Sequence, residues 1–262
     1  MDTNNMKQAA ENAFLALFRD YSEEGVRQYI AADMVQHNPS VPTGRDALIG
    51  FLPALRETGI SYTNHRILQD GEFVVLHNSF TNAQAFGADK IVTIDIYRMK
   101  DGQAIEHWDA IGPIVEETAS GRSQVDGATE ITDLDKTDAN KALAVSLIED
   151  VLMGKDPSKV TEYISAESYH QHNPTIKDGL SGLDEAVEQL TAQNNMFQYH
   201  TIHQVLGEGN FVLTVSEGSW SGAAHVFYDL FRMDGGKIVE HWDVIQQIPT
   251  EGLANTNGMF GF

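Results

Sequence analysis

Apolar positions in the first quarter of the chain recur with the spacing of an α-helix. From about Asn4 to Arg19 they fall on one stripe, which predicts an amphipathic helix. Ser22 and the two glutamates after it predict a cap and a short second helix through Ile30. A third helix is expected from about Asp46 to Glu57. The residue before a proline is disfavoured in a helix, so His37-Asn38-Pro39 is expected to be a loop.

Beyond the third helix the apolar positions alternate with a period near two, which is typical of strands. The dipeptides Asp70-Gly71 and Asp101-Gly102 favour tight hairpin turns, so neighbouring strands are expected to run antiparallel. Three helices followed by strands is an α+β order. The expected strands are Ser61–Leu68, Phe73–Phe80, Ala88–Met99 and Ala104–Ile111.

The second half of the chain repeats this plan. Helices are expected at about Thr137–Met153, Pro157–Ile164 and Leu183–Asn194. Strands are expected near Tyr199–Leu206, Phe211–Glu217, Ala223–Met233 and Lys237–Gln247. Between the halves, a stretch rich in polar residues and glycine shows no periodicity and is interpreted as a linker.

Two short motifs show that the halves are copies. Glu106-His107-Trp108-Asp109 returns as Glu240-His241-Trp242-Asp243, an offset of 134 residues (243 − 109). Gln36-His37-Asn38-Pro39 returns as Gln171-His172-Asn173-Pro174, an offset of 135 (172 − 37). A repeat of about half of 262 residues predicts two tandem domains. The predicted division is 1–114, a linker at 115–136, 137–250, and a glycine-rich tail at 251–262 that is either mobile or docked on a neighbour.

Composition excludes several function classes. Seventeen basic and 38 acidic residues give a net charge of −21, which disfavours nucleic acid and anionic membrane surfaces as partners. The absence of cysteine excludes disulfides, thiolate metal sites and a cysteine nucleophile. No apolar run approaches the roughly 18 residues of a membrane span. The first residues lack the features of a signal peptide, so a soluble, cytoplasmic protein is expected.

The repeated motif places ionisable side chains on one face of the predicted sheet. Alternate residues of a strand share a face, so His107 and Asp109 are neighbours, and Asp95 lies on the preceding strand. The hairpin at Asp101-Gly102 would bring these three together. The second copy offers the corresponding set Asp229, His241 and Asp243.

Two carboxylates and an imidazole in a mostly apolar pocket are suited to proton transfer. Burial disfavours the ionised carboxyl and raises its pKa, and two neighbouring carboxyls push their titrations apart. These six residues are therefore the candidate catalytic groups. The alternative is that the aspartates are hydrogen-bonded structural carboxylates and the histidines satisfied core residues, which folding alone would also keep in both copies.

The histidine loops are candidate substrate-binding segments. A loop held by proline can present His37 and Asn38, or His172 and Asn173, at the mouth of a pocket. The alternative, of equal weight, is that these residues only form a turn, since Asn and His are common in turns before proline. Trp108 lies on the strand face opposite His107 and is interpreted as a packing residue, like Trp242.

No metal or organic cofactor is expected. Histidines and aspartates occur in both halves, but none has the spacing of a recognised metal motif. Glycine-rich phosphate loops and a Gly-x-Ser-x-Gly nucleophile motif are also absent from the sequence, which argues against nucleotide-dependent and serine-hydrolase chemistry.

Taken together, the motifs resemble one known family. Gln-His-Asn-Pro, Gly44-Arg45-Asp46 before a helix, Asp95-Ile96-Tyr97-Arg98, a glycine turn and the closing Ile-Glu-His-Trp-Asp are similar to the SnoaL-like polyketide cyclases of the nuclear-transport-factor-like superfamily. The likeness spans nearly all of both halves. In the second half Gly182-Leu183-Asp184 replaces Gly44-Arg45-Asp46.

The resemblance implies a cone-shaped α+β domain, in which three N-terminal helices and a curved antiparallel sheet enclose a pocket. It implies that the aspartate at the positions of Asp109 and Asp243 is the acid/base of an intramolecular aldol condensation that needs no cofactor. Where those cyclases carry another pocket histidine, this chain has Asp95 and Asp229. Members usually form dimers through their sheets, so two fused copies would form a pseudo-dimer within one chain; further oligomerisation is left open.

The sequence thus favours a cofactor-independent acid/base enzyme acting on a small, mostly apolar carbonyl compound, by cyclase-like or by isomerase- or dehydratase-like chemistry. One alternative is a non-catalytic module of the same fold that binds a small ligand. Another is a scaffold held together by packing between sheets, in which side chains fill the interior of each cone-shaped domain and leave no cavity. Fold alone does not decide among them.

Overall fold

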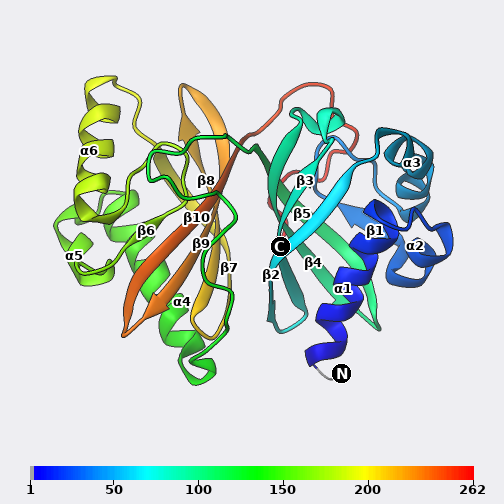
Figure 1. Ribbon diagram of the computed structural model, residues 1–262, viewed down its shortest axis with the longest axis horizontal. Coiled ribbons are helices and arrows are strands. Elements are labelled where there is room, and N and C mark those ends of the chain that lie inside the picture. The colour runs from blue at the N-terminus through cyan, green and yellow to red at the C-terminus, as the bar shows by residue number, and fades with distance from the viewer. Residues whose placement is uncertain (1–2) are drawn as a thin grey trace. The chain divides into compact units, whose positions relative to one another are not determined.

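The computed structural model describes residues 3–262, and Met1 and Asp2 lie outside the described residues. The chain divides into two compact units (Figure 1). Unit 1 contains the residues up to Ile114 together with Pro249–Phe262, and unit 2 contains Val115–Ile248. Each unit holds one copy of the repeat, so the predicted α+β class with two tandem domains is confirmed.

Unit 1 places three helices on one face of a five-stranded sheet (Figure 1). The strand order is β1-β5-β4-β3-β2. The predicted hairpins at Asp70-Gly71 and Asp101-Gly102 connect β2 to β3 and β4 to β5, which run antiparallel as expected. The elements are α1 (Thr3–Phe18), α2 (Glu23–Tyr29), β1 (Ile30–Gln36), α3 (Arg45–Thr58), β2 (Ser61–Asp70), β3 (Phe73–Thr81), the short η1 (Gln84–Phe86), β4 (Lys90–Lys100) and β5 (Gln103–Pro113).

Strand β1 differs from the sequence prediction, which extended the second helix through Ile30 and expected only four antiparallel strands. Helix α2 ends at Tyr29, and the chain continues directly as a strand parallel to β5. Ile30 and Met34 are fully buried, whereas the two residues between Ala31 and Met34 are exposed. This segment is too short and irregular to show a period of two, so its pairing with β5 decides its conformation.

The helices bury one apolar stripe against the sheet. Phe14 of α1 is buried, and its ring lies 5.3 Å from that of Tyr62 and 5.4 Å from that of Tyr97. Burying an aromatic side chain of this size stabilises the fold by roughly 1.5–3 kcal/mol. The helix-covered face of the sheet is therefore mostly apolar, and polar groups on it lie in a medium that disfavours charge.

Unit 2 has the same topology, with strand order β6-β10-β9-β8-β7 and β6 parallel to β10. The first helix, predicted through Met153, turns into a π-helical segment after Leu147. The third begins at Gly179 instead of Leu183. The elements are η2 (Leu134–Lys136), α4 (Thr137–Leu147), η3 (Ile148–Leu152), η4 (Pro157–Lys159), α5 (Val160–Tyr163), β6 (His170–Gln171), α6 (Gly179–Ala192), β7 (Gln198–Glu208), β8 (Phe211–Trp220), β9 (Ala223–Asp234) and β10 (Lys237–Gln247).

The predicted linker and tail are both docked. The linker belongs to unit 2, where the backbone N–H of Ala119 donates to Pro174 O at 2.8 Å. The tail belongs to unit 1, where the backbone N–H of Ala254 donates to Pro39 O at 2.7 Å. The linker therefore follows the first copy but packs on the second, and the tail follows the second copy but packs on the first. Within residues 3–262, no helix has both the length and the apolar character needed to cross a membrane.

Candidate functional site

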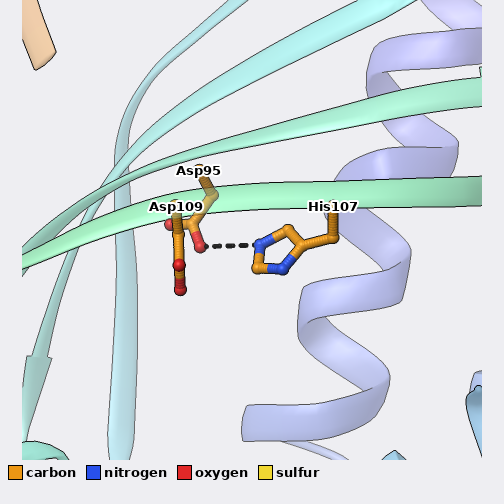
Figure 2. A group of neighbouring side chains, drawn as sticks. All are labelled: Asp95, His107 and Asp109. Atoms are coloured by element: carbon orange, nitrogen blue, oxygen red, sulfur yellow. Dashed lines mark hydrogen bonds and ion pairs between the residues drawn. The ribbon is translucent and has the colours of Figure 1, made fainter. Parts of the chain in front are cut away.

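Strands β4 and β5 bring three ionisable side chains together on the helix-covered face of unit 1. Asp95 lies directly opposite Asp109, and His107 lies opposite Tyr97, two pairs further along and on the same face of the sheet. All three point to the same side of the sheet (Figure 2), and one carboxylate oxygen of each aspartate and one ring nitrogen of His107 lie within 4.8 Å of one another. The convergence predicted for Asp95, His107 and Asp109 is therefore present in the structure, and we call this group the Asp-His-Asp cluster of unit 1.

The tautomer of His107 is fixed by Gln36. Oε1 of Gln36 accepts a hydrogen bond from the backbone N–H of Asn38 at 3.0 Å, which identifies it as the amide oxygen. The same oxygen lies 2.8 Å from His107 Nδ1, so Nδ1 carries a proton. Nε2 then faces Asp95 Oδ1 at 3.1 Å. This second contact requires one more proton, held between the imidazole and the carboxyl.

The surroundings of Asp95 decide where that proton lies. Its Oδ2 accepts hydrogen bonds from Asn78 Nδ2 at 2.8 Å and from the hydroxyl of Thr93. Two donors favour the ionised carboxylate, so the proton belongs to His107. Burial alone would lower the pKa of His107, but the hydrogen bond to Asp95 and the charges of both cluster carboxylates outweigh it and raise this pKa.

Asp109 is the reactive member of the cluster. Its Oδ2 accepts a hydrogen bond from Asn38 Nδ2 at 2.7 Å. Its Oδ1 is buried and has no hydrogen-bond partner among the described residues. Burial raises the pKa of Asp109 to about 6; the positive charge of His107 opposes this shift and the negative charge of Asp95 adds to it. Near neutral pH the residue is thus a carboxylate with one oxygen free to accept a proton.

Unit 2 repeats the arrangement. Gln171 Oε1 accepts from the backbone N–H of Asn173 at 3.0 Å and lies 2.9 Å from His241 Nδ1. Nε2 of His241 lies 3.1 Å from Asp229 Oδ1. Nδ2 of Asn173 donates to Asp243 Oδ2 at 2.6 Å. Burial raises the pKa of Asp243, and the pKa of His241 is raised despite burial by its contact with Asp229 and by the charges of the two carboxylates.

The donors to the first carboxylate differ between the units. The hydroxyl of Tyr199 lies 3.2 Å from each oxygen of Asp229. By strand register, Ser216 occupies the place of Asn78. A phenol thus supplies in unit 2 the hydrogen bonding that an amide and a hydroxyl supply in unit 1. The two clusters share their acid/base groups but differ in the residues that donate to the first carboxylate.

Each cluster also has a donor set that could hold a divalent cation. An imidazole whose Nδ1 is bonded to a carbonyl presents Nε2 as ligands to metals often do, and carboxylates are suitable co-ligands. In unit 1, however, Asp95 already accepts from Asn78, Thr93 and His107. The protonated imidazole supplies the positive charge that a cation would otherwise provide. The expectation that no metal is needed stays a prediction.

The histidine and the asparagine of each predicted substrate-binding loop lie in different surroundings. Asn38 and Asn173 lie against Asp109 and Asp243, within the clusters. His37 is turned away: its Nε2 lies 2.8 Å from Glu106 Oε1, and its ring stacks on Trp108 at 4.7 Å. Glu106 and Trp108 flank His107 on β5 and therefore point to the opposite side of the strand.

His172 lies in the same way on Glu240, at 3.0 Å, and on Trp242, at 4.7 Å. The structure therefore brings the loop asparagines to the candidate catalytic groups, but not the loop histidines. A substrate-binding role for the asparagines stays a prediction.

Sequence reasoning missed the two glutamines that fix the histidines. Gln36 and Gln171 are the first letters of the repeated Gln-His-Asn-Pro motif, so the signal was present in the sequence. Asn78 gave no such signal, because by strand register Ser216 stands at the corresponding position of the other copy. Tyr199 corresponds to Tyr62, but no pattern in the sequence marked either tyrosine as a partner of the aspartate.

The fold and the clusters define a class: tandem α+β domains, each with helices on a mixed five-stranded sheet and a buried Asp-His-Asp group. The family model of the SnoaL-like domain matches residues 12–107. This part of the chain matches the SnoaL-like domain that the sequence motifs indicated. The match includes Asp95 and His107 and ends two residues before Asp109. Unit 2 has the same strand order and the same cluster.

Several solved structures are similar to one copy of the domain. TsrD from Streptomyces laurentii is 20% identical and matches 42% of this chain and 90% of its own, with a TM-score of 0.37. A Bacillus cereus protein assigned as a polyketide cyclase is 23% identical over 42% of this chain and 76% of its own, with a TM-score of 0.37. A Kribbella flavida protein assigned as a ketosteroid isomerase is 22% identical over 49% of this chain and 93% of its own, with a TM-score of 0.36. Among curated protein sequences, none matches the chain significantly.

Proposed function

We propose that the protein is a cofactor-independent acid/base enzyme that removes a proton from the carbon next to a carbonyl group of a small, mostly apolar substrate. The observation that carries this proposal is Oδ1 of Asp109, a buried carboxylate oxygen with no hydrogen-bond partner among the described residues. It lies beside an imidazole that is held protonated by Asp95. A base and a fixed positive charge are thus adjacent in a largely apolar surrounding.

In the proposed reaction, Asp109 Oδ1 takes the proton from the α-carbon. The electrons of the C–H bond form the C=C bond of an enolate, and negative charge moves to the carbonyl oxygen. The nearby His107 imidazolium stabilises this charge, an effect that is stronger in a site that excludes water. The enolate then attacks a second carbonyl, regains its proton at another carbon, or expels a leaving group, according to the structure of the substrate.

The likeness to SnoaL-like domains supports the assignment of the base. In the cyclases that the sequence resembles, the aspartate at the position of Asp109 and Asp243 has the acid/base role. The raised pKa of Asp109, about 6, is suited to a general base that works near neutral pH. Buried carboxylate oxygens are usually hydrogen-bonded, and a catalytic role would explain why this one is not.

Both copies carry the required groups, but they are not equivalent. Asp109 is 6% exposed, whereas Asp243 is partly exposed. We propose that both clusters abstract protons and that the different residues around the first carboxylate give them different substrate preferences.

The test is hydrogen exchange in D2O, which reports proton abstraction whatever reaction follows it. A panel of cyclic ketones and β-dicarbonyl compounds is incubated with the protein, and deuterium at the α-carbon is followed by NMR. We expect exchange to be catalysed, and to fall by about 10²–10⁴-fold in the Asp109→Asn, Asp243→Asn double variant. The exchange rates of the two single variants show how much each copy contributes to the total rate.

Asp101→Asn is the matched control, because this aspartate is exposed in the β4–β5 turn and Asn tolerates its positive φ of 51°. Its exchange rate should equal that of the wild type. An unchanged rate in the folded double variant would rule out the proposed base. Saturable binding of panel compounds without any exchange would favour the non-catalytic binding module instead.

A further inference from the structure

The segments that follow the two copies dock in the same register, each on the other copy. The tail strap, residues 254–262, lies on unit 1, and the linker strap, residues 119–127, lies on unit 2. The backbone N–H of Ala254 donates to Pro39 O, and that of Ala119 donates to Pro174 O. The two donors are 135 residues apart (254 − 119), and so are the two acceptors (174 − 39). The histidine loops show the same offset. The docking thus follows the duplication.

The tail strap contacts the backbone of the loop that holds the unit 1 cluster. Nδ2 of Asn257 donates to Gln36 O at 2.9 Å and to Thr43 Oγ1 at 2.8 Å. Nδ2 of Asn255 donates to Asn38 O at 2.7 Å and to Val41 O at 2.9 Å. The carbonyl groups so held belong to Gln36 and Asn38, the two residues whose side chains fix His107 and Asp109.

His37 and Trp108 form the platform on which the tail strap lies. His37 Nδ1 donates to Gly258 O at 2.7 Å, and Phe262 stacks on Trp108 at 4.6 Å. Glu106, which also contacts Arg98, holds the other nitrogen of His37. The histidine and tryptophan, which the acid/base mechanism does not use, are thereby explained as the docking surface of the strap.

The linker strap makes the corresponding contacts on unit 2. The hydroxyl of Ser120 donates to Gln171 O at 2.7 Å. His172 Nδ1 donates to Ser123 O at 2.6 Å, again with an offset of 135 from Gly258 (258 − 123). Trp242 Nε1 donates to Asp126 O at 2.9 Å. The donating side chain differs between the straps, Asn257 in one and Ser120 in the other. In both units, however, the acceptor is the backbone carbonyl of the loop glutamine, and the loop histidine donates to a backbone carbonyl of the strap.

We propose that each strap is a positioning element for the cluster of the copy on which it docks, so that unit 1 needs the chain segment following the second copy to set its own acid/base groups. Asn255 and Asn257 are the positioning residues in unit 1, and Ser120 is the one in unit 2. They act through Gln36, Asn38 and Gln171. The expected effect of the straps on the rate of proton abstraction rests on the proposed function, whereas their effect on the tautomers of His107 and His241 does not.

The discriminating experiment uses the full chain and the imidazole ¹⁵N signals of His107 and His241. In Asn255→Ala, Asn257→Ala, the loop carrying Gln36 and Asn38 is released. We expect the ¹⁵N pattern of His107 to lose its fixed Nδ1–H form and the pKa of Asp109 to rise from about 6, because the Asn38 hydrogen bond that lowers it is weakened. The His241 signals should not move. Ser120→Ala should give the opposite result, with His241 changed and His107 unchanged.

A second pair of variants tests the docking without touching these hydrogen bonds. A Cβ at Gly261 would come within 2.9 Å of the His37 ring, whereas one at Gly252 would meet nothing within 4 Å. We expect Gly261→Ala to reproduce the His107 change. Gly252→Ala should not, although its positive φ of 69° makes it the locally more strained substitution.

Unchanged His107 signals in both the asparagine double variant and Gly261→Ala would overturn the positioning role. The same would follow if every strap variant altered both histidines equally, since that indicates general destabilisation. Shifted His107 signals in a protein that catalyses no exchange would retain the strap and reject only the proposed function. In an active protein, we expect the α-proton exchange that depends on Asp109 to fall at least tenfold with the asparagine variant, and the exchange that depends on Asp243 to be retained.

Discussion

Gln36 Oε1 lies 2.8 Å from His107 Nδ1, and this one contact determines which nitrogen of the imidazole faces Asp95. Replacing Gln36 by leucine keeps most of the side-chain volume but removes the acceptor. We expect a loss of about 1–3 kcal/mol in the free energy of unfolding, because buried N–H groups are left unpaired. We also expect the pKa of His107 to fall. Denaturant unfolding and ¹⁵N NMR of the histidines measure the two effects.

Gln171→Leu is the internal control for this prediction. It should alter His241 and leave His107 unchanged, because Gln171 contacts the second cluster only. A Gln36→Leu protein in which His107 keeps its Nδ1 proton and its pKa would show that the glutamine does not set the tautomer.

The stability of the protein should depend on Asp109 in a pH-dependent way. Its pKa is about 6 in the folded protein against an ordinary value of 3.8, so the folded state binds a proton more tightly than the unfolded state. Stability is therefore lost as the pH rises through that window, by at most about 3 kcal/mol. Asp109→Asn carries no such charge. Relative to the wild type, this variant should gain stability between about pH 4 and about pH 8, as measured by denaturant unfolding at each pH.

The sign of this change is the decisive result. If Asp109→Asn loses stability relative to the wild type over the same pH range, the carboxylate is stabilised by the fold and is not held at a cost for function. Asp101→Asn, at an exposed turn, is the control for the loss of one carboxylate elsewhere on the same hairpin.

Much of this architecture was predictable because it depends on local patterns. The α1 stripe and the hairpin turns are set by helical spacing and by glycines that tolerate positive φ, such as Gly71 at 58° and Gly102 at 80°. Strand alternation placed His107 and Asp109 on one face, but their register against Asp95 depends on a β-bulge between Arg98 and Met99. With the regular register of a two-residue turn, Asp95 would stand opposite Trp108.

What could not be predicted depends on contacts between distant segments. Strand β1 has no periodicity of its own and is defined by parallel pairing with β5. The orientation of His37 could not be predicted, because it depends on Glu106, Trp108 and a carbonyl group 221 positions away, at Gly258. The straps showed no repeated sequence signal, because backbone groups that any residue offers pair Ala254 with Pro39 and Ala119 with Pro174. The strap side chains that hold the loops also differ between the copies.

The rate of α-proton exchange should follow a bell-shaped pH profile. Asp109 must be ionised to accept the proton, so the rate should rise with pH through about 6. His107 must stay protonated, so the rate should fall once the pH exceeds its raised pKa. The profile is to be measured in Asp243→Asn, where only the first cluster contributes. Introducing Gln36→Leu in that background should move the alkaline limb to lower pH, and an unmoved limb would mean that another group titrates there.

Docking of the linker strap on unit 2 can be tested at a single glycine. A Cβ at Gly127 would lie 2.3 Å from Glu240 Oε1 and 2.8 Å from the Trp242 ring, closer than packed atoms approach. Gly121 also has positive φ, 75° against 96°, but a Cβ there would meet nothing within 4 Å. Both alanine variants therefore strain the backbone, and only Gly127→Ala also displaces the strap. We expect Gly127→Ala to cost about 1–3 kcal/mol more than Gly121→Ala in the free energy of unfolding, as for overpacking of a filled site. Its tryptophan fluorescence should also change as Trp242 becomes accessible to quencher. Equal losses in the two variants would mean that the strap does not press on Trp242 in solution.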